Sequence, residues 1–561
     1  MNPFETNKKF ARGITKLWEF SKKGELDELG LKRGFTHFLI IGGLPCLIER
    51  GMGMDSDILT ITTLGVGAAS AIHAWKTEYM NSDEEDKSSE FFAEYKDMKK
   101  ANMTKSKTGL FFGKMNGNFI TKPENIEGHV IVLGPTGVGK TSGYVIPSLW
   151  RWKDAVLAFD PKGGELARKT AVFRSRFQPV YVFNPFDKEC ARYNPIEHCR
   201  TKDEAQSMAE ILIPKQSKEN AYWEEMARSI VAAAIYEGHL ENRTLVEICK
   251  FICTNEMEQL KEHYLNHPDE KVRILASPLR HLKDKTEAFV MSDLMRSLNT
   301  IAADDHIAFA TSQSDWDLSE LEKPATVYLS VPEEKLKLPQ YRKLLNIIIN
   351  QAVDHLTERK EMKEEDNDRP RILFLIDELT TLGYIPSLLQ SLATLRSRGV
   401  TLSLAFQAFS QVDELYGVNG RKTIMNTARY KLILGIEDTD TQKYFTELVG
   451  TRKVKSKSIT RNSEDDRYNV SESKKDVPLI RTTEWKNLDK ENAVVLISPI
   501  GTAKLEKIKY FKDSRLKRMM RIDLIRSKRK QELQESVLEL QEEIVGFVEE
   551  AEESAERREA K

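Results

Sequence analysis

The sequence predicts an α/β protein in which a mostly parallel β-sheet, covered by helices, carries a phosphate-binding loop. Three observations support this fold class. A G-x-x-x-x-G-K-[ST] motif lies between a strand-like run and a helix-like run in residues 129–149. Apolar, β-branched runs then alternate with helix-like segments, as in folds built from strand–helix–strand units. A block without strand patterns, residues 200–312, interrupts this alternation, and we expect it to form an inserted all-α domain.

The composition limits the classes of protein to consider. A chain of 561 residues with 40% hydrophobic residues is long enough for two or three domains. Its formal net charge of −1 excludes a global basic field, so contacts with nucleic acid must come from local patches or a pore. The cysteines form no C-x-x-C pair, and we expect buried, free thiols in a reducing compartment. They are Cys46, Cys190, Cys199, Cys249 and Cys253.

Two apolar stretches near the N-terminus predict a membrane anchor. Residues 58–75 carry no formal charge and are long enough to span a bilayer, whereas residues 34–48 are short and need flanking basic side chains that reach the interface. Basic residues gather before the first stretch, which places both ends of the hairpin in the cytoplasm. We expect two spans within residues 1–76; the alternative is a buried helical hairpin of a soluble protein. A linker, residues 77–127, then leads to folded α/β sequence near Gly128.

The phosphate-binding loop is the strongest local signal. Its sequence, HVIVLGPTGVGKTSGYVIPSL, places a β-branched strand before the loop and a helix pattern after it. The glycines let the backbone wrap round phosphate oxygens, and successive N–H groups with the positive helix end hold the anion. We expect Lys140 to contact the β- and γ-phosphates and the Thr141 hydroxyl to ligate Mg²⁺. The nucleotide-contacting residues are then Gly134, Pro135, Thr136, Gly137, Val138, Gly139, Lys140, Thr141 and Ser142.

A second acidic site follows a strand pattern at RILFLIDEL, residues 371–379. The apolar run Ile372–Ile376 is typical of a central parallel strand, and α/β sheets bind ligands at the carboxyl ends of such strands. We expect Asp377 to hold Mg²⁺ with Thr141, and Glu378 to polarise the attacking water as general base. The alternative is a helix-capping pair. The sequence contains no N-K-x-D segment that reads guanine, so the predicted cofactors are ATP and Mg²⁺.

Further strand-like runs complete the sheet, with helix patterns such as 338–357 and 385–397 between them. These runs are residues 155–162, 179–185, 325–332, 401–408, 430–437 and 493–499, with 504–511 as an edge strand. Two of the strand ends carry polar side chains that allow two interpretations. Gln407 either senses the γ-phosphate or is a capping or surface residue. Asp160 and Lys162, in FDPKGGE, either brace the nucleotide loop or build a turn.

The predicted all-α domain separates the two halves of the nucleotide site. Its helix patterns cover residues 203–213, 221–238, 243–252 and 284–299. Because the block lies between strands of the sheet, it explains the long separation of Lys140 from Asp377 along the chain. We expect Trp223, in AYWEEMARSI, to belong to the hydrophobic core rather than to a ligand site.

A series of motifs runs in one order between residues 129 and 511. They are GPTGVGKTSGYVIPSL, FDPKGGEL, VFNPFD, YNPIE, SDWDLSELEKPATVYLSVPEEKL, FLIDELTTLGYIP, FQAFSQVDELYG, IMNTARYKLILG and RTTEWKNL. In this order, and behind an N-terminal two-span hairpin, the motifs resemble those of the TraG/TraD-type coupling proteins of type IV secretion systems, which are conjugative coupling ATPases.

The resemblance implies a RecA-like nucleotide-binding domain formed by residues 128–199 and 313–513, with the all-α domain inserted and an N-terminal transmembrane hairpin. It implies a homo-hexamer in the bacterial inner membrane, multi-pass, with the ATPase domain in the cytoplasm beneath the secretion channel. Such proteins recruit relaxase with single-stranded DNA, or effector proteins, and couple ATP hydrolysis to their transfer through the channel components.

The resemblance also implies a nucleotide site between subunits, completed by an arginine of the neighbouring subunit. Arg429, in NTARYKLILG, is the expected arginine, and Arg398, in LRSRGV, is the alternative. The predicted catalytic residues are therefore Glu378, Lys140, Arg429 and Gln407.

Two further segments are candidates for contacts with partners. Residues 452–461, RKVKSKSITR, are basic without acidic neighbours and either hold phosphates or form a solvated hairpin. The charged helical tail, residues 514–561, carries a short apolar stripe that either docks a partner or packs back on the core. The stripe consists of Leu533, Val537, Leu540, Ile544 and Phe547.

Two other functions compete with the coupling ATPase. One is an FtsK/HerA-like DNA-pumping ATPase, which the membrane hairpin and the all-α insertion oppose. The other is a non-hydrolysing membrane receptor that docks secreted proteins and keeps a vestigial nucleotide fold. The intact set of Lys140, Thr141, Asp377 and Glu378 opposes this second function.

Deleting residues 1–76 should release the protein from membranes and leave a soluble ATPase core, because both predicted spans precede the sheet. Sedimentation of the full and truncated chains with membranes in high salt measures this. A truncated chain that still sediments would mean that another hydrophobic anchor exists.

Overall fold

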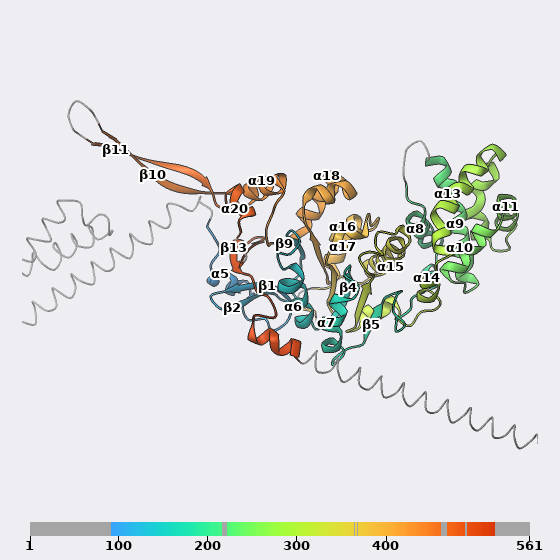
Figure 1. Cartoon of the computed structure of the whole chain (residues 1–561), viewed down its shortest axis with the longest axis horizontal. Helices are drawn as coiled ribbons and strands as arrows, with labels where there is room; N and C mark the ends of the chain where they lie inside the picture. Colours follow the sequence, from blue (N-terminus) through green and yellow to red (C-terminus); the bar gives the residue numbers. More distant parts are fainter. Residues whose placement is uncertain are drawn as a thin grey trace, which may run out of the picture. The chain divides into compact units, whose positions relative to one another are not determined.

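The computed structural model describes residues 91–215, 221–363, 365–366, 368–461, 468–488 and 491–521 (Figure 1). These residues fall into two compact units: Thr451–Val477 belong to one, and the rest belong to the other. The predicted spans at 34–48 and 58–75, and the tail from residue 522 onward, lie outside the described residues. Within the described part of the chain, no helix has the length and apolar character needed to cross a membrane.

The larger unit is built on an eleven-stranded sheet in the order β2-β1-β13-β12-β9-β3-β8-β7-β4-β6-β5. Its strands are β1 Leu110–Met115, β2 Asn118–Lys122, β3 His129–Leu133, β4 Ala155–Asp160, β5 Val180–Phe183, β6 Thr326–Ser330, β7 Ile372–Ile376, β8 Val400–Phe406, β9 Ala428–Ile433, β12 Asn492–Ile497 and β13 Gly501–Glu506. The strands from β9 to β5 are parallel, and those from β12 to β2 are antiparallel. The predicted α/β fold with a mostly parallel sheet is confirmed.

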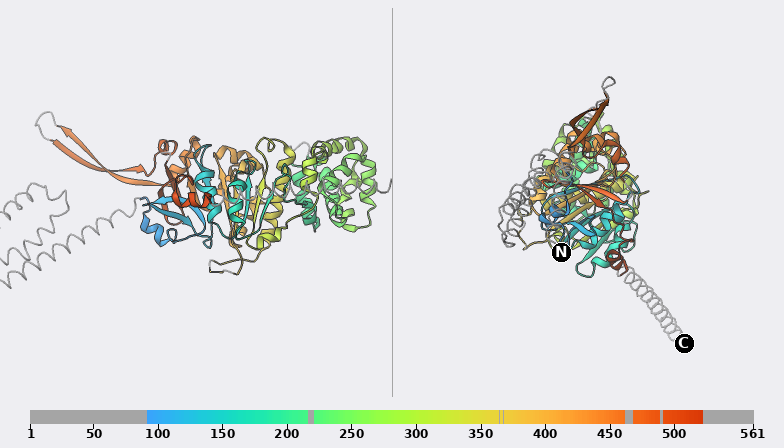
Figure 2. Two further views of the ribbon diagram at one scale, coloured as in Figure 1. Left: turned by 60° about the horizontal axis from the view of Figure 1, so that its bottom comes forward. Right: turned by 90° about the vertical axis from the view of Figure 1, so that its left-hand side faces the viewer.

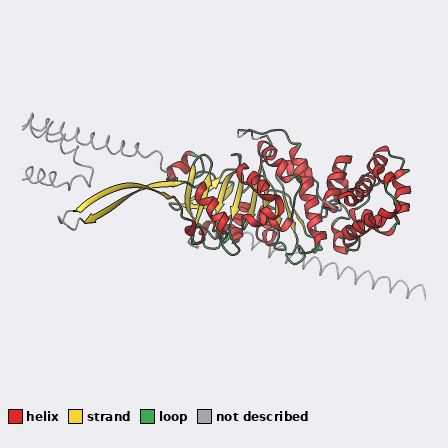
Figure 3. Ribbon diagram, turned by 90° about the horizontal axis from the view of Figure 1, so that it is seen from above, coloured by secondary structure: helices red, strands yellow, loops and turns green. Residues whose placement is uncertain are grey.

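The central strands are buried on both faces. In β3, Ile131 and Leu133 pack into one hydrophobic cluster, and the alternating Val130 and Val132 pack into the other. Continuous apolar runs form such strands because successive side chains point to opposite faces, and both faces are covered. Figure 3 shows helices flanking the strands. The α-helices of this unit outside residues 200–312 are α5 Tyr95–Lys100, α6 Ile146–Arg151, α7 Glu165–Arg174, α15 Pro339–Thr357, α16 Leu379–Leu382, α17 Leu388–Ser397, α18 Phe409–Thr427, α19 Thr439–Leu448 and α20 Thr482–Lys486.

A block of helices occupies the chain between β5 and β6 (Figures 1 and 2). It consists of α8 Lys202–Leu212, α9 Ala221–Leu240, α10 Leu245–Thr254, α11 Met257–Leu265, α12 Glu270–Ala276, α13 Asp284–Ala302 and α14 Asp305–Ala310. Its buried side chains belong to the same hydrophobic cluster as one face of the sheet. Trp223 is half-buried against this cluster and stacks on Phe289 with ring centroids 5.5 Å apart. Cys190, Cys199 and Cys249 are buried free thiols.

The sheet begins before Gly128, in the segment that the sequence analysis assigned to a linker. Strands β1 and β2 form a hairpin in which Met115 pairs with Asn118. The two residues between them, Asn116 and Gly117, have φ values of 52° and 73°, as a type I′ turn requires. Because β1 also pairs with β13, the run that was predicted as an edge strand lies inside the sheet.

The basic segment 452–461 is part of a hairpin, as one of the two interpretations of its sequence expected. Strand β10, Thr451–Arg461, forms a two-stranded sheet with β11, Tyr468–Pro478. The first residues of β10, Thr451 to Val454, are exposed.

Candidate functional site

The carboxyl ends of neighbouring parallel strands form one cavity of about 590 Å³. Strand β8 lies between β3, which leads into the phosphate-binding loop, and β7, which leads into Asp377. Leu133, the last residue of β3, pairs with Phe406 of β8, so Gln407 lies level with the start of the loop. Ile376, the last residue of β7, pairs with Leu404, two positions earlier in β8, so Asp377 lies deeper in the sheet than the loop does. The cavity is lined by Pro135, Thr136, Gly137, Gly139, Lys140, Thr141, Ser142, Lys162, Glu165, Asp377, Glu378 and Gln407, among others.

The loop has the backbone that a phosphate cradle requires. Gly137 and Gly139 adopt φ values of 83° and 95°, which glycine reaches at little cost. Gly134 has no room for a side chain, because an added Cβ would lie 2.7 Å from Val138 Cγ2. Gly134 and Val138 therefore shape the loop instead of lining the cavity. A π-helical turn, Thr141–Val145, follows and continues into α6.

Thr141 and Asp377 form the part of the cavity that fits a divalent cation. Thr141 Oγ1 donates a hydrogen bond to Asp377 Oδ2 at 3.0 Å. The other carboxylate oxygen, Asp377 Oδ1, is buried and has no hydrogen-bond partner in the described part of the chain. Burial raises the pKa of Asp377 to about 6. A hydroxyl next to an unpaired carboxylate oxygen is the donor set that Mg²⁺ prefers, so these residues fit the predicted ion.

Glu378 is held by three neighbouring side chains. Gln407 Nε2 donates to Glu378 Oε2 at 3.1 Å, and Thr380 Oγ1 donates to Glu378 Oε1 at 3.0 Å. Lys140 Nζ lies 3.6 Å from Glu378 Oε2 and donates to the Gly134 carbonyl at 2.7 Å. Although Glu378 precedes the short helix α16, its side chain makes no capping hydrogen bond. The carboxylate therefore faces the cavity.

Gln407 connects the loop to this carboxylate. Its Oε1 lies 3.4 Å from Thr136 Oγ1, while its Nε2 contacts Glu378. The geometry thus agrees with a role inside the cavity and not with a surface cap.

Asp160 and Lys162 take different roles. Asp160 is buried, and its carboxylate accepts hydrogen bonds from the backbone N–H of Lys162 at 3.1 Å and of Leu166 at 2.6 Å. It therefore builds the turn before α7. Lys162 extends into the cavity, where its Nζ lies 3.4 Å from Thr141 Oγ1 and 3.7 Å from Glu165 Oε2.

Neither candidate arginine lines the cavity of its own chain. Arg429 lies in β9 near its amino end, and its Nε and Nη1 donate to the carbonyls of Ser498 at 3.1 Å and Glu127 at 3.4 Å. Arg398 follows α17 and donates to the carbonyl of Arg359. Arg398 precedes β8, and Arg429 lies at the start of β9. Both arginines are therefore at the amino ends of parallel strands, opposite the carboxyl ends that lead into the loop.

Residues 79–538 match the family model described as type IV secretory system conjugative DNA transfer. The chain belongs to this family. A curated relative, protein VirD4 of Agrobacterium fabrum, is 26% identical over 443 residues, which cover 73% of this chain and 63% of the relative. Coupling protein TraD of Escherichia coli K12 is 23% identical over 312 residues, covering 53% of this chain and 40% of TraD. The chain thus spans less than two thirds of the length of these relatives.

Among solved structures, the fold is similar to that of the bacterial conjugative coupling protein TrwBΔN70. The unbound monoclinic form has a TM-score of 0.60 at 19% identity, covering 75% of this chain and 94% of that one. The complex of TrwB with ADP and Mg²⁺ has a TM-score of 0.57 at 18% identity, covering 75% and 93%. The shared feature at these identities is the fold.

The cavity also has lining residues for which the sequence predicted no role, although some of them lie within the quoted motifs. Thr380 and Thr381 come from α16, directly after Glu378. Glu333, Lys337 and Arg342 come from the loop after β6 and the start of α15. The available signal was the position of this segment, because β6 is parallel to β4 and ends at the same edge of the sheet.

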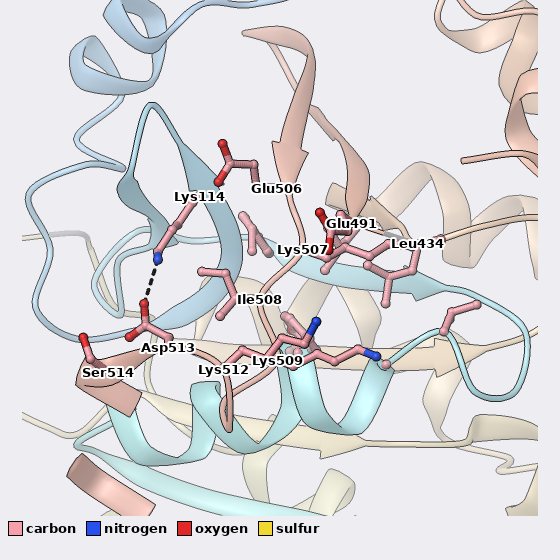
Figure 4. A pocket seen from close by; sticks show the side chains of 16 residues that line it. Lys114, Leu434, Glu491, Glu506, Lys507, Ile508, Lys509, Lys512, Asp513 and Ser514 are labelled. Carbon is pink, nitrogen blue, oxygen red and sulfur yellow. Dashed lines mark hydrogen bonds and ion pairs between the residues drawn. The ribbon is translucent and has the colours of Figure 1, made fainter. Parts of the chain in front are cut away.

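A second cavity, of about 550 Å³, shares Gly139 with the first (Figure 4). One wall is the segment after β13. In this segment, the Tyr510 backbone N–H donates a hydrogen bond at 3.1 Å to the carbonyl of Ser142, in the π-helical turn that follows the phosphate-binding loop. Lys507 Nζ donates to the Leu434 carbonyl at 2.6 Å, and burial lowers its pKa to about 8. A side chain at Gly143 would lie 2.7 Å from the Ile508 carbonyl oxygen, so glycine permits this close packing.

Asp377→Asn should make the protein more stable at pH 7 when nucleotide and Mg²⁺ are absent. The pKa of Asp377 is raised from 3.8 to about 6, so the folded state binds its proton more tightly than the unfolded state. This carboxyl therefore lowers stability as pH rises from about 4 to 6, and the loss persists above 6. The variant should gain about 1–3 kcal/mol at pH 7 and progressively less toward pH 5.

Thermal unfolding of both proteins from pH 5 to 8 measures the effect. Asp203→Asn, at a carboxyl that is 78% exposed, is the matched control and should change little. An Asp377→Asn variant that is no more stable than the wild type at pH 7 would contradict the prediction.

Proposed function

We propose that the chain is a membrane-anchored coupling ATPase that recruits relaxase–DNA or protein substrates and drives their transfer through a type IV secretion channel during conjugation. The observation that carries this proposal is the cavity in which Thr141 meets Asp377 and Lys140 and Gln407 meet Glu378. The family match supports the cargo, since the matching family model is described as conjugative DNA transfer, and VirD4 and coupling protein TraD are similar to 73% and 53% of this chain.

In this proposal each side chain of the cavity would take a separate role in ATP hydrolysis. Thr141 and Asp377 would hold Mg²⁺, which supplies positive charge to the phosphate oxygens. Lys140 exchanges its contacts with the Gly134 carbonyl and Glu378 for the β- and γ-phosphates. Glu378 orients the attacking water and accepts its proton, while Gln407 and Thr380 hold the carboxylate in position.

The proposal extends to assembly and location. By resemblance, the protein is a homo-hexamer at the bacterial inner membrane, with two spans in residues 1–76 and the ATPase domain in the cytoplasm. Residues 128–199 and 313–513, together with strands β1 and β2 that join the same sheet, would form the RecA-like domain, and residues 200–312 would form the inserted all-α domain. Arg429 of one subunit would complete the site of the next, which is compatible with its position outside the cavity of its own chain.

Lys140→Ala should abolish ATP hydrolysis and DNA transfer, because the phosphates lose their cationic partner. Glu378→Gln should still bind ATP with Mg²⁺ but barely turn over, because the base is lost while Asp377 remains. ATPase assays of the purified protein and transfer frequency in cells that lack the native copy measure both effects.

Lys169→Ala, which removes an exposed lysine of α7, is the matched control for these variants. Undiminished turnover in Glu378→Gln would show that another group is the base. Full DNA transfer by Lys140→Ala would favour the non-hydrolysing docking receptor.

Arg429→Ala should bind nucleotide yet be nearly inactive, since an arginine supplied by a neighbour is worth about 10³–10⁵ in rate in related phosphoryl transfers. Mixing it with Lys140→Ala should restore part of the activity, because some interfaces then combine an intact loop with an intact arginine. Mixed oligomers without any such rescue would exclude Arg429 and make Arg398→Ala the next variant to test.

A further inference from the structure

Three consecutive residues at the start of α15 face three different places. Tyr341 OH donates to Asp304 Oδ2 at 2.7 Å, and Asp304 caps α14 of the helical block. Lys343 Nζ donates to the carbonyl of Ser297 in α13 at 3.1 Å. Arg342, between them, lines the cavity that contains Lys140, Asp377 and Glu378. The nucleotide cavity and the helical block therefore meet at one turn of one helix.

Arg342 is a cation without a counterion among the described residues. Its side chain is half-buried, and no hydrogen bond or ion pair joins it to another described residue. Two other cations of the cavity have partners, since Lys140 lies against Glu378 and Lys162 lies against Glu165, whereas Lys337 is exposed to solvent. A guanidinium group presents several N–H donors in one plane, which matches the oxygens of a phosphate. Arg342 thus offers the cavity a binding group for an anion.

The packing of α15 places this group at the Glu378 end of the cavity. Asn346 lies one turn after Arg342 on the same face of the helix. Its Nδ2 donates to the carbonyls of Leu382 at 3.0 Å and Tyr384 at 3.1 Å. These carbonyls end and follow α16, the short helix that begins directly after Glu378. Arg342 therefore lines the same cavity as the carboxylate that would face the terminal phosphate.

We propose that Arg342 binds the terminal phosphate of the nucleotide held by its own subunit and that α15 transmits this contact to the helical block. The inference rests on the proposed function, because it requires the loop to bind a nucleoside triphosphate. Loss of the terminal phosphate on hydrolysis removes the partner of Arg342. A helix bonded on both sides then responds as one element.

The bonds along α15 support the transmission. Asn350 Nδ2 donates to Ser207 Oγ in α8 at 3.1 Å, and Tyr193 OH donates to Gln351 Oε1 at 3.0 Å. Together with Tyr341 and Lys343, Asn350 joins α15 to helices α14, α13 and α8 of the block, and Gln351 joins it to the segment that precedes the block. Asn346 joins the same helix to the segment after Glu378. A displacement of Arg342 and its helix would therefore move both the helical block and the segment that follows Glu378.

Nucleotide affinity of the purified full chain tests the phosphate contact. We expect Arg342→Ala to weaken binding of the non-hydrolysable analogue ADPNP about 10–100-fold while leaving ADP binding within about 2-fold, with Arg342→Lys intermediate. Arg280→Ala, at an exposed arginine that does not line the cavity, is the matched control. Unchanged ADPNP affinity, or an equal loss for both nucleotides, overturns the inference. A wild-type protein that binds neither nucleotide overturns the proposed function as well.

Hydrogen exchange tests the transmission. The wild type should show different protection of α13 and α14 with ADPNP and with ADP, and Arg342→Ala should lose this difference. The double variant Tyr341→Phe, Lys343→Met should also lose it while keeping its affinity for ADPNP. A difference that persists in either variant contradicts the role of α15.

Discussion

The hydrogen bond between the Thr141 hydroxyl and the Asp377 carboxylate is the contact on which the site depends. It joins the ends of β3 and β7, which are separated in the sheet by β8 and in the sequence by the whole helical block. Only a parallel sheet with this strand order and register brings the two residues together. Because Ile376 pairs with Leu404, two positions before the end of β8, Asp377 lies beneath the loop and not at its rim. The register is thus the cause of its burial.

The same burial makes the site responsive to ligand. A carboxyl with one unpaired, buried oxygen is costly to ionise in the absence of a cation, which is why its pKa is raised. Lys140 and Glu378 meanwhile satisfy each other and nearby polar groups. A nucleotide with Mg²⁺ has to replace these internal contacts with stronger ones. The side chains of the site therefore already lie in position, but before a ligand binds, Lys140 is paired with Glu378 and not with a ligand.

The helical block is continuous with the sheet through a shared hydrophobic cluster. Helix α15 runs through this shared region, because its buried face belongs to the cluster while its first turn borders the nucleotide cavity. A close-packed interior transmits small displacements instead of absorbing them. The architecture consequently places the cavity and the helical block in mechanical contact.

The sequence by itself determined the α/β class, the family, the loop and the acidic pair, because these depend on local patterns: a glycine-rich turn between strand and helix, and an apolar run ending in Asp377 and Glu378. It also contained the β1–β2 hairpin in Asn116-Gly117, a turn signal that was hidden within a segment assigned to a linker. The tertiary structure alone decided what depends on strand order and register. It placed Gln407 between the loop and Glu378, divided the roles of Asp160 and Lys162, and kept Arg429 out of the cavity of its own chain. It also brought Arg342 to the cavity, since no local pattern distinguishes an arginine on a buried helix from one that faces a ligand.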